Sequence, residues 1–261
     1  MMQYTNYIFD LYGTLVDIHT DEGKPELWQH MAGWYSAYGA DWSAEELQRA
    51  YRRMVREEEE KLAAATGSAY PEIKLETVFL RLLNEAPARH KAAEAPKSAR
   101  AKTSEAPRGT RTGRPGYSKA ETAWAQAAAN MFRVISRERL SCFPGVPELL
   151  KSLKDQGCRV FLLSNAQSVF TLPEMEQCGI ADCFDDIFIS SDRGIKKPEP
   201  RFLKELMQKH SMDPAQTVMI GNDPLTDMAV AKACGIAGIL VSSDGRDIPN
   251  VPLPAAPGRP R

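Results

Sequence analysis

The chain has 261 residues, of which 43% are hydrophobic and 26% are charged, values that are ordinary for a soluble globular protein. A formal net charge of −1 gives no reason to expect nucleic acid or an anionic membrane as a partner, and no apolar run approaches the roughly 18 residues of a membrane span. Five scattered cysteines, and an N-terminus without the pattern of a signal peptide, indicate a cytoplasmic protein with reduced thiols.

The first element in chain order is a strand at the start of YIFDLYGTLVD, residues 7–17. Its residues of high β-propensity lead directly into Asp10, and a turn residue follows before Thr14. Tyr12 stands two positions after the acid, where a second acid would be easy to rationalise. The chemistry of this stretch therefore depends on why a tyrosine stands there.

Residues 17–141 carry helical patterns and follow that strand. SAEELQRAYRRMVREEEEKL has a capping box, in which Ser43 is followed three residues later by Glu46, and then apolar residues at helical spacing. LETVFLRLL and ETAWAQAAANMFRVI are further amphipathic helix candidates. The pattern predicts a helical insert over 17–141.

Within the insert, residues 86–119 contain no Val, Ile, Leu, Phe, Met or Trp, and they carry nine Lys or Arg against two Glu. Such a segment cannot bury enough apolar surface to offset the entropy of ordering it, so we predict that it is disordered. A basic arm that binds nucleic acid or an acidic partner is the less favoured interpretation. The Pro-rich tail over 248–261 is expected to be extended or disordered.

From Cys142 onward, short β-rich runs alternate with helical stretches. Strands are predicted at 158–164, 186–190, 217–221 and 238–242, with helices in PELLKSLKDQG, PRFLKELMQKH and TDMAVAKACG. This alternation predicts right-handed βαβ units and a parallel sheet, which the opening strand joins. The fold class is therefore α/β: a doubly wound, Rossmann-like parallel sheet formed by 1–16 and 142–247, with the helical segment inserted.

Polar residues that can carry chemistry follow the predicted strands. In open parallel sheets, ligands bind at the carboxyl ends of the strands. The residues at that edge are Asp10, Thr14, Ser164, Asn165, Lys197, Asp223 and Asp227. A carboxylate can act as a nucleophile, a Lys and a hydroxyl can hold an anionic group, and carboxylates from two loops can hold Mg²⁺. The ordered set predicts displacement at an anionic electrophile, phosphorus above all.

Four motifs in order resemble the haloacid dehalogenase-like (HAD) hydrolase superfamily. FDLYGT resembles motif I, LLSN motif II, GIKKPEPRF motif III and IGNDPLTD motif IV, and FPGVPELL resembles the return of the chain into the core. The resemblance covers residues 5–16 and 140–245. The helical insert resembles the type-C1 cap of the family, a domain that chooses the substrate.

The resemblance also implies a role for each matching residue. The catalytic set would be Asp10, Tyr12, Thr14, Ser164 and Lys197, with Asp10 as the nucleophile and Lys197 balancing charge. The substrate-binding set would be Thr14, Ser164, Asn165 and Lys197. A bound Mg²⁺ would have as its ligands Asp10, the main-chain carbonyl of Tyr12, Asp223 and Asp227.

The sequence departs from the family pattern in two places. In motif IV, alignment on Asp227 puts Asn222 in place of the first acid, whereas alignment on spacing puts Asp223 there. We favour Asp223, because a direct metal ligand gains from charge. At the position of Tyr12, phosphatases of the superfamily commonly have an Asp that protonates the leaving group, whereas its 2-haloacid dehalogenases often have Tyr. A phenol with a pKa of about 10 is a poor base at pH 7.

The leading hypothesis is a Mg²⁺-dependent phosphatase that acts on a small phosphorylated metabolite through an aspartyl-phosphate at Asp10. Without the second acid it would be slow, or limited to good leaving groups such as acyl phosphates. One alternative is a 2-haloacid dehalogenase-like hydrolase that uses an acyl-aspartyl ester, although motif IV lacks the dehalogenase pattern and residues 17–48 contain no Arg. Another is a catalytically weak member that binds a ligand or a partner. The sequence indicates neither the substrate nor the oligomeric state.

Overall fold

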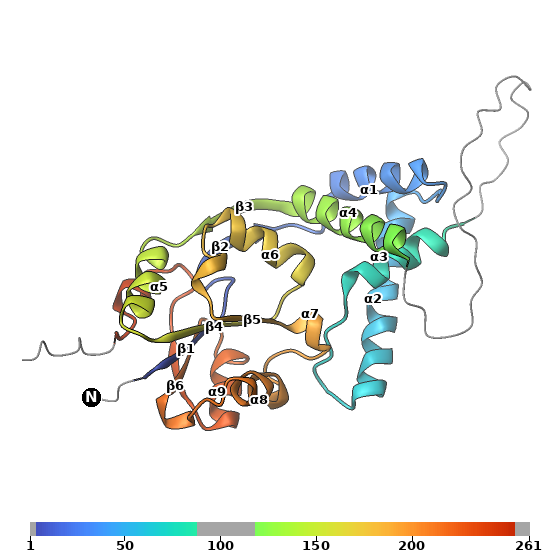
Figure 1. Ribbon diagram of the computed structural model, residues 1–261. Helices are drawn as coiled ribbons and strands as arrows, with labels where there is room; N and C mark the ends of the chain where they lie inside the picture. Colours follow the sequence, from blue (N-terminus) through green and yellow to red (C-terminus); the bar gives the residue numbers. More distant parts are fainter. Residues whose placement is uncertain (1–3, 88–117, 254–261) are drawn as a thin grey trace, which may run out of the picture.

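A computed structural model describes residues 4–87 and 118–253 of the chain. A parallel sheet of five strands, in the order β5-β4-β1-β6-β7, runs through its larger part (Figure 1). The strands are β1 (Asn6–Phe9), β4 (Arg159–Ser164), β5 (Asp186–Ile189), β6 (Thr217–Gly221) and β7 (Ala237–Leu240). The predicted parallel sheet is confirmed, and each predicted strand is matched to within two residues at its ends.

The first strand of the chain is the central strand of the sheet. It pairs in parallel with β4 on one side and β6 on the other, so that Ile8 lies opposite Phe161 and Met219. Ile8 faces one hydrophobic core, whereas Tyr7 and Phe9 face the other. Burial on both faces explains why the strands read as continuous apolar runs rather than as alternating patterns.

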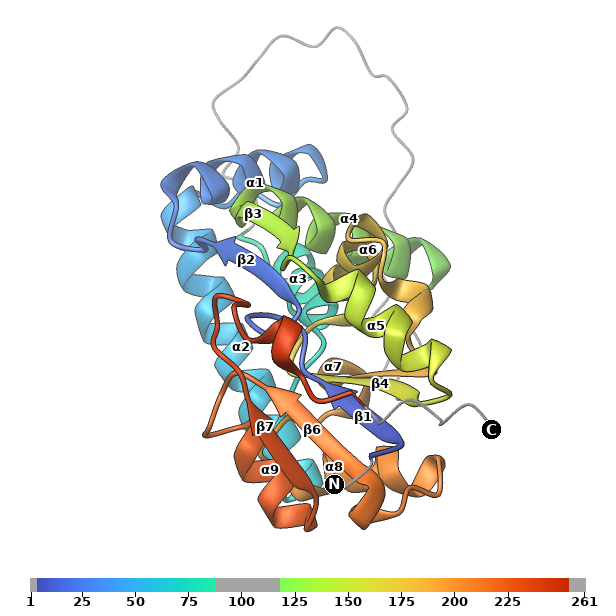
Figure 2. The same cartoon turned by 90° about the vertical axis from the view of Figure 1, so that its left-hand side faces the viewer.

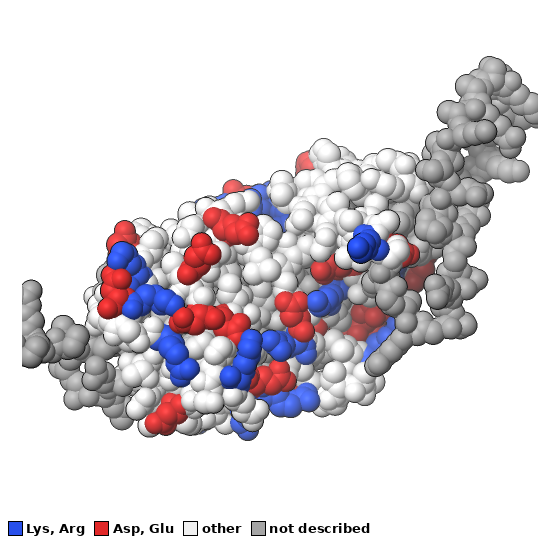
Figure 3. Space-filling view, in the orientation of Figure 1, with Lys and Arg blue, Asp and Glu red and all other residues white. Residues whose placement is uncertain are grey.

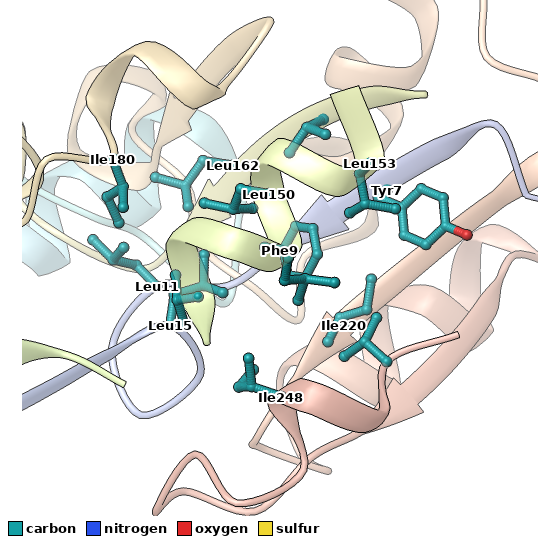
Figure 4. Packing of buried hydrophobic residues seen from close by; sticks show 14 of the residues in the cluster. Tyr7, Phe9, Leu11, Leu15, Leu150, Leu153, Leu162, Ile180, Ile220 and Ile248 are labelled. Carbon is teal, nitrogen blue, oxygen red and sulfur yellow. The ribbon is translucent and has the colours of Figure 1, made fainter. Parts of the chain in front are cut away.

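Helices cover both faces of the sheet, as a doubly wound fold requires. They are α5 (Val146–Asp155) and α6 (Ser168–Gln177) on one face, and α8 (Pro200–Lys209) and α9 (Asp227–Cys234) on the other. Figure 4 shows Leu150 and Leu153 of α5 close to Tyr7 and Phe9 of β1, within one core of fully or nearly fully buried side chains. The helices predicted at 147–157, 200–210 and 226–235 are confirmed.

The inserted cap is a group of helices with a hydrophobic core of its own. Its helices are α1 (Pro25–Ala37), α2 (Ala44–Thr66), α3 (Leu75–Asn84) and α4 (Lys119–Ser136). Trp28, Tyr51, Phe79 and Phe132 meet in that core with ring centroids 5.2–5.9 Å apart. The capping box predicted at the start of α2 is present, and a second one, from Ser118 with Glu121, begins α4.

A two-stranded antiparallel ribbon connects the sheet with the cap (Figure 2). Its strands are β2 (Val16–Thr20) and β3 (Arg137–Cys142), which the sequence did not predict. VDIHT and RERLSC carry charges and are only partly buried, so neither has the apolar run of the main strands. The domain boundaries predicted at 16/17 and 141/142 fall inside this ribbon and stay a prediction.

The remaining described elements are short: α7 (Ser190–Arg193) and the 3₁₀ turns η1 (Ala181–Cys183), η2 (Pro214–Gln216) and η3 (Ile248–Asn250). The prediction of an extended or disordered tail is wrong for its first residues, because Ile248 and Val251 are buried against the core around α5 and the Tyr7 hydroxyl donates to the carbonyl of Pro252 at 2.9 Å. Most of the segment predicted to be disordered, 86–119, lies outside the described residues.

The visible surface in Figure 3 carries Lys and Arg interspersed with Asp and Glu, without a large area of one sign. This agrees with the near-zero net charge of the sequence. Among the described residues, no helix combines the length and the apolar character that crossing a membrane would require.

Candidate active site

Nine residues line a cavity of about 210 Å³ at the carboxyl ends of the central strands. They are Asp10, Tyr12, Ser164, Asn165, Lys197, Asn222, Asp223, Thr226 and Asp227. Every residue of the predicted site is among them except Thr14, which lies directly behind and contacts Asp10. The sheet topology accounts for this convergence, because neighbouring parallel strands end at one edge and deliver their following loops to it.

A buried lysine holds the two central carboxylates of the site together. Lys197, with 2% of its surface exposed, donates from Nζ to Asp10 Oδ1 and to Asp227 Oδ1, both at 2.7 Å. The third ammonium proton is directed at the carbonyl of Leu163, 2.8 Å away. All three donors of the ammonium are therefore used, and the carboxylate of Asp10 is fixed in one orientation.

The ion pairs control the charges of these groups. Burial alone would lower the pKa of Lys197, but the charges and hydrogen bonds of Asp10 and Asp227 hold it above its usual value. Burial is the main cause that raises the pKa of Asp227, and the like charge of Asp10 adds to it while Lys197 opposes it. Two carboxylates share one cation, so the site keeps an excess of negative charge.

The hydroxyl groups of two residues contact the carboxylate of Asp10. The hydroxyl of Thr14 lies 3.2 Å from Asp10 Oδ2 and 3.1 Å from Asn222 Oδ1, and the hydroxyl of Ser164 lies 3.3 Å from Asp10 Oδ1. Gly13 turns the loop between Asp10 and Thr14 with a φ of +78°, and a Cβ atom at Gly13 would lie 2.6 Å from the Asn222 side chain. Only glycine meets both conditions without strain.

The side chain of Asn165 bonds to the main chain of Lys197 and so holds the loop that carries this lysine. Its Nδ2 donates to the main-chain carbonyl of Lys197 at 3.0 Å, and its Oδ1 accepts from the main-chain N–H of the same residue at 2.8 Å. This pair of bonds connects the end of β4 to the loop that carries the ammonium. Asn165 thus positions Lys197 in addition to lining the cavity, and the substrate-binding role predicted for it stays a prediction.

The two acids of motif IV have different surroundings. Both oxygens of Asp227 are engaged, Oδ1 by Lys197 and Oδ2 by the main-chain N–H of Asp223 at 3.1 Å. Asp223 accepts the N–H of Leu225 at 2.7 Å through Oδ1, whereas its Oδ2 makes none of the hydrogen bonds found among the described residues. Asn222 turns its side chain toward Thr14. Of the motif IV carboxylates, Asp223 is therefore the one whose oxygen is available to bind a metal ion.

The donor chemistry of the cavity fits a hard cation. Within 4–87 and 118–253, no three His, Cys, Asp or Glu side chains are grouped as in a preformed metal centre. Mg²⁺ does not require such a group, since it keeps several waters and uses one or two protein carboxylates. Asp10 and Asp223 both line the cavity and supply that number.

The hydroxyl of Tyr12 is committed to a buried carboxylate outside the cavity. It donates to Glu174 Oε2 of α6 at 2.5 Å, with the hydroxyl of Thr171 3.2 Å away. Burial, followed by the charge of Glu174, raises the pKa of Tyr12 far above its usual value. The phenol therefore stays protonated, and its proton is directed at Glu174 rather than at a ligand above Asp10.

Two arginines from the cap side of the molecule hold Glu174. Arg133 of α4 donates to both of its oxygens at 2.8 and 3.1 Å, and Arg137 of β3 donates at 3.0 Å. The Arg133 guanidinium also lies 5.5 Å from the centre of the Tyr12 ring. Sequence reasoning missed this network, because an acid inside a helix and two arginines some forty residues earlier form no motif.

A second cavity, of about 370 Å³, lies between the cap and the sheet. Tyr12 and Asn165 line both cavities, so the second one opens beside the first. Its other walls come from β2, α2, α4 and α6 and from the segment that leads into α3. A ligand whose reacting group lay at Asp10 would extend into this space.

Two phosphatases are similar in sequence to part of this chain. A phosphoglycolate phosphatase of Vibrio vulnificus is 38% identical over 95 residues, 36% of this chain and 41% of the relative. A glyceraldehyde 3-phosphate phosphatase of Methanothermobacter thermautotrophicus is 30% identical over 102 residues, 39% of this chain and 45% of the relative. The chain thus covers less than half the length of these relatives.

Likeness to a solved structure extends over more of the molecule. The structure of a 2-haloacid dehalogenase from Pseudomonas syringae pv. tomato superposes with a TM-score of 0.55 and 19% identity, covering 92% of this chain and 86% of that chain. At that identity the likeness concerns the fold alone. The model of the haloacid dehalogenase-like hydrolase family matches residues 4–235, which include every strand of the sheet except β7, the cap and every predicted site residue. The chain belongs to the haloacid dehalogenase-like hydrolases.

Proposed function

We propose that the protein is a Mg²⁺-dependent phosphatase that transfers the phosphoryl group of a small metabolite to Asp10 and then to water. The observation that carries this proposal is the buried Lys197, which fixes the Asp10 carboxylate in a polar cavity at 2.7 Å. The phosphatases among the relatives support it. We also assign the helical cap to type C1, because its helices follow motif I. The five free cysteines support a cytoplasmic location.

The residues of this chain have complementary tasks in such a reaction. Asp10 attacks phosphorus, and the bond to the departing oxygen breaks as the ester to Asp10 forms. Lys197 balances the charge that accumulates beside Asp10, and the hydroxyls of Thr14 and Ser164 lie within reach of the transferring group's oxygens. Water then cleaves the aspartyl-phosphate and restores Asp10.

A Mg²⁺ ion would be held by Asp10, Asp223 and the main-chain carbonyl of Tyr12. When bound, it would supply positive charge against the phosphoryl oxygens. Asp227 would act through Lys197 instead, because both of its oxygens are already engaged. This division of roles favours Asp223 over Asn222 and Asp227 as the motif IV ligand.

Tyr12 limits the leaving group that this site can expel. Because the phenol proton is directed at Glu174, no side chain at position 12 is available to protonate a departing alkoxide. The site is therefore suited to esters whose leaving group is weakly basic, or whose developing charge is stabilised in another way.

The direct test is phosphate release from 4-nitrophenyl phosphate, whose leaving group needs no protonation. We expect turnover with Mg²⁺, and a fall to background in Asp10→Asn because the amide cannot form the ester. Asp182→Asn, an exposed acid remote from the cavity, is the matched control and should keep the activity of the parent. Turnover that persisted in Asp10→Asn would rule out the aspartyl mechanism.

Mg²⁺ should also stabilise the protein in the absence of substrate. At a concentration about a hundredfold above Kd, we expect the melting temperature to rise by roughly 5–10 °C, because the ion binds only the folded chain. Asp223→Asn should remove most of the rise, whereas Asp182→Asn should leave it intact. A rise of the same size in Asp223→Asn would assign the metal to other residues.

Tyr12 also favours a second candidate, hydrolytic dehalogenation of 2-haloacids through an acyl ester of Asp10. Halide departs without a proton, so a phenol held by Glu174 is no handicap there. Chloride release from 2-chloropropionate without Mg²⁺ distinguishes this reaction from phosphate release. If several haloacids gave no halide, the phosphatase would stand alone.

A further inference from the structure

The cavity beneath the cap has a distinctive set of charges. Its lining includes the carboxylates of Glu22, Glu59 and Glu72 and a single cationic side chain, Arg133. Because Tyr12 and Asn165 line both cavities, a group that leaves phosphorus at Asp10 would extend into this space. The charges that line this cavity therefore act on the leaving group of the phosphatase reaction proposed above. The inference rests on that proposed function.

The cation in the lining of this cavity is already paired with a carboxylate. Arg133 uses Nε and Nη2 to hold Glu174, which is 1% exposed, in a two-pronged ion pair. A carboxylate of a ligand would have to compete with that pair for the guanidinium. Arg133 thus has its guanidinium engaged by Glu174, and the lining sets three glutamates against this one cation.

Nearby cations only partly neutralise the three carboxylates that line the cavity. The ammonium of Lys196 lies 3.7 Å from Glu72 and 3.8 Å from Glu59, beyond hydrogen-bonding distance, and the two acids share it. The cations that act on Glu22 are Arg133 and the exposed Arg52. Of the charged side chains that line the cavity, three are carboxylates and one is a cation, because neither Lys196 nor Arg52 is part of the lining.

Glu72 is the most buried of the three acids. Its side chain is 15% exposed, Gln167 donates to one of its oxygens at 2.9 Å, and Ser190 donates to the other at 3.2 Å. These neutral donors fix its orientation without cancelling its charge. Burial raises the pKa of Glu72 above its usual value, although Lys196 opposes the shift, so a nearby cation would stabilise the ionised form.

We propose that the substrate is a phosphomonoester whose leaving group carries an ammonium group, which Glu72 and Glu59 bind with Glu22 completing the acidic wall. The same wall repels a leaving group that carries a carboxylate. Aliphatic side chains such as Val55 and Leu75 line the remainder and accept a short carbon chain. A volume of about 370 Å³ suits a leaving group of a few to a dozen non-hydrogen atoms.

An ammonium group also answers the difficulty that Tyr12 creates. The positive charge stabilises the negative charge that develops on the departing oxygen when the phosphorus–oxygen bond breaks. The leaving group thereby becomes less basic, and the reaction depends less on a proton from the enzyme. A positively charged leaving group therefore suits a site in which Tyr12 donates its proton to Glu174.

The test compares three phosphate esters of nearly equal length: 2-aminoethyl phosphate, 2-hydroxyethyl phosphate and carboxymethyl phosphate. We expect kcat/KM to fall in that order, with at least about a tenfold difference between the ammonium and the carboxylate ester. Equal values, or a preference for the carboxylate ester, would overturn the inference. Either result would leave the proposed phosphatase standing, because phosphate release that depends on Asp10 would still be observed.

Variants assign the preference to the acidic wall. Glu72→Gln and Glu59→Gln should each reduce the ratio of ammonium to carboxylate ester by about tenfold, mainly through KM. Glu60→Gln, an exposed neighbour on α2, is the matched control and should leave the ratio unchanged. A ratio unaffected by both wall variants would overturn the assignment. No Asp10-dependent release from any ester or from 4-nitrophenyl phosphate would overturn the function and this inference together.

Discussion

Replacing Lys197 with methionine is expected to lower the free energy of unfolding by about 3–5 kcal/mol and to reduce kcat by at least about a thousandfold. The side chain is 1% exposed and its ammonium is the cation shared by Asp10 and Asp227. Methionine has a similar length but no charge, so two buried carboxylates would face each other without a partner. Denaturant unfolding of the parent and the variant measures the stability term, and single-turnover phosphate release measures the catalytic one.

The neighbouring residue provides the control. Lys196→Met removes an ammonium that is 32% exposed and lies 3.7 Å or more from its acidic neighbours, so we expect a change below about 1 kcal/mol. A similar loss of stability in both variants would mean that the effect comes from losing a lysine in this loop rather than from the buried ion pairs. An undiminished stability in Lys197→Met would refute the arrangement around Asp10.

Most of the candidate site could be predicted because its residues follow strands. Each of Asp10, Ser164 and Asp223 comes within two residues after, or at the end of, a strand with a continuous apolar run, which is a strong local signal. Parallel pairing then dictates that these residues meet at one edge. Local sequence and topology together suffice for this part of the site, without knowledge of packing.

The rest depends on packing that no local pattern encodes. Strands β2 and β3 are separated by more than one hundred residues and carry partly exposed polar side chains, so only their pairing makes them strands. Glu174 looks like an ordinary helix residue in sequence, and it becomes notable only when Arg133 and Tyr12 are brought to it. The hydrogen bond from Tyr12 to Glu174 could therefore not be predicted from the residues of motif I.

The charge of the cap cavity is likewise a property of the folded chain. Glu59 belongs to an acidic run that reads as a solvated helix face, and Glu72 lies in a connecting segment. The fold turns one member of that run toward the catalytic edge and leaves Glu60 exposed. The proposed selection of the substrate thus rests on residues that the sequence alone assigns to the surface.

Replacing Glu174 with glutamine should destabilise the protein by about 3–5 kcal/mol, because it leaves two arginines without their counter-charge. The carboxylate is 1% exposed, and it accepts hydrogen bonds from Tyr12, Arg133 and Arg137. Glutamine can accept some of these bonds but its NH₂ group faces donors. Glu176→Gln, an exposed acid two residues later, is the matched control and should change stability by less than about 0.5 kcal/mol.

The stability difference between the parent and Glu174→Gln should depend on pH in a defined direction. Burial alone would raise the pKa of Glu174, but the hydrogen bonds and charge of Arg133, with the bonds from Tyr12 and Arg137, lower it below its usual value. A lowered pKa in the folded state contributes stability that is present above the unfolded value of about 4.3 and disappears as pH falls through the folded value.

Urea unfolding at pH 7 and at successively lower pH values measures this contribution. The difference in unfolding free energy between the parent and Glu174→Gln should be constant near pH 7 and should shrink as the pH falls below about 4.3, because the carboxyl group takes up a proton in the unfolded parent at a higher pH than in the folded parent. A difference that stayed constant down to acid unfolding would show that Glu174 contributes by shape and hydrogen bonding alone. A difference that grew as the pH fell would mean that the folded protein holds the proton of Glu174 more tightly than the unfolded chain does, and this would contradict a charged pair with Arg133 and Arg137.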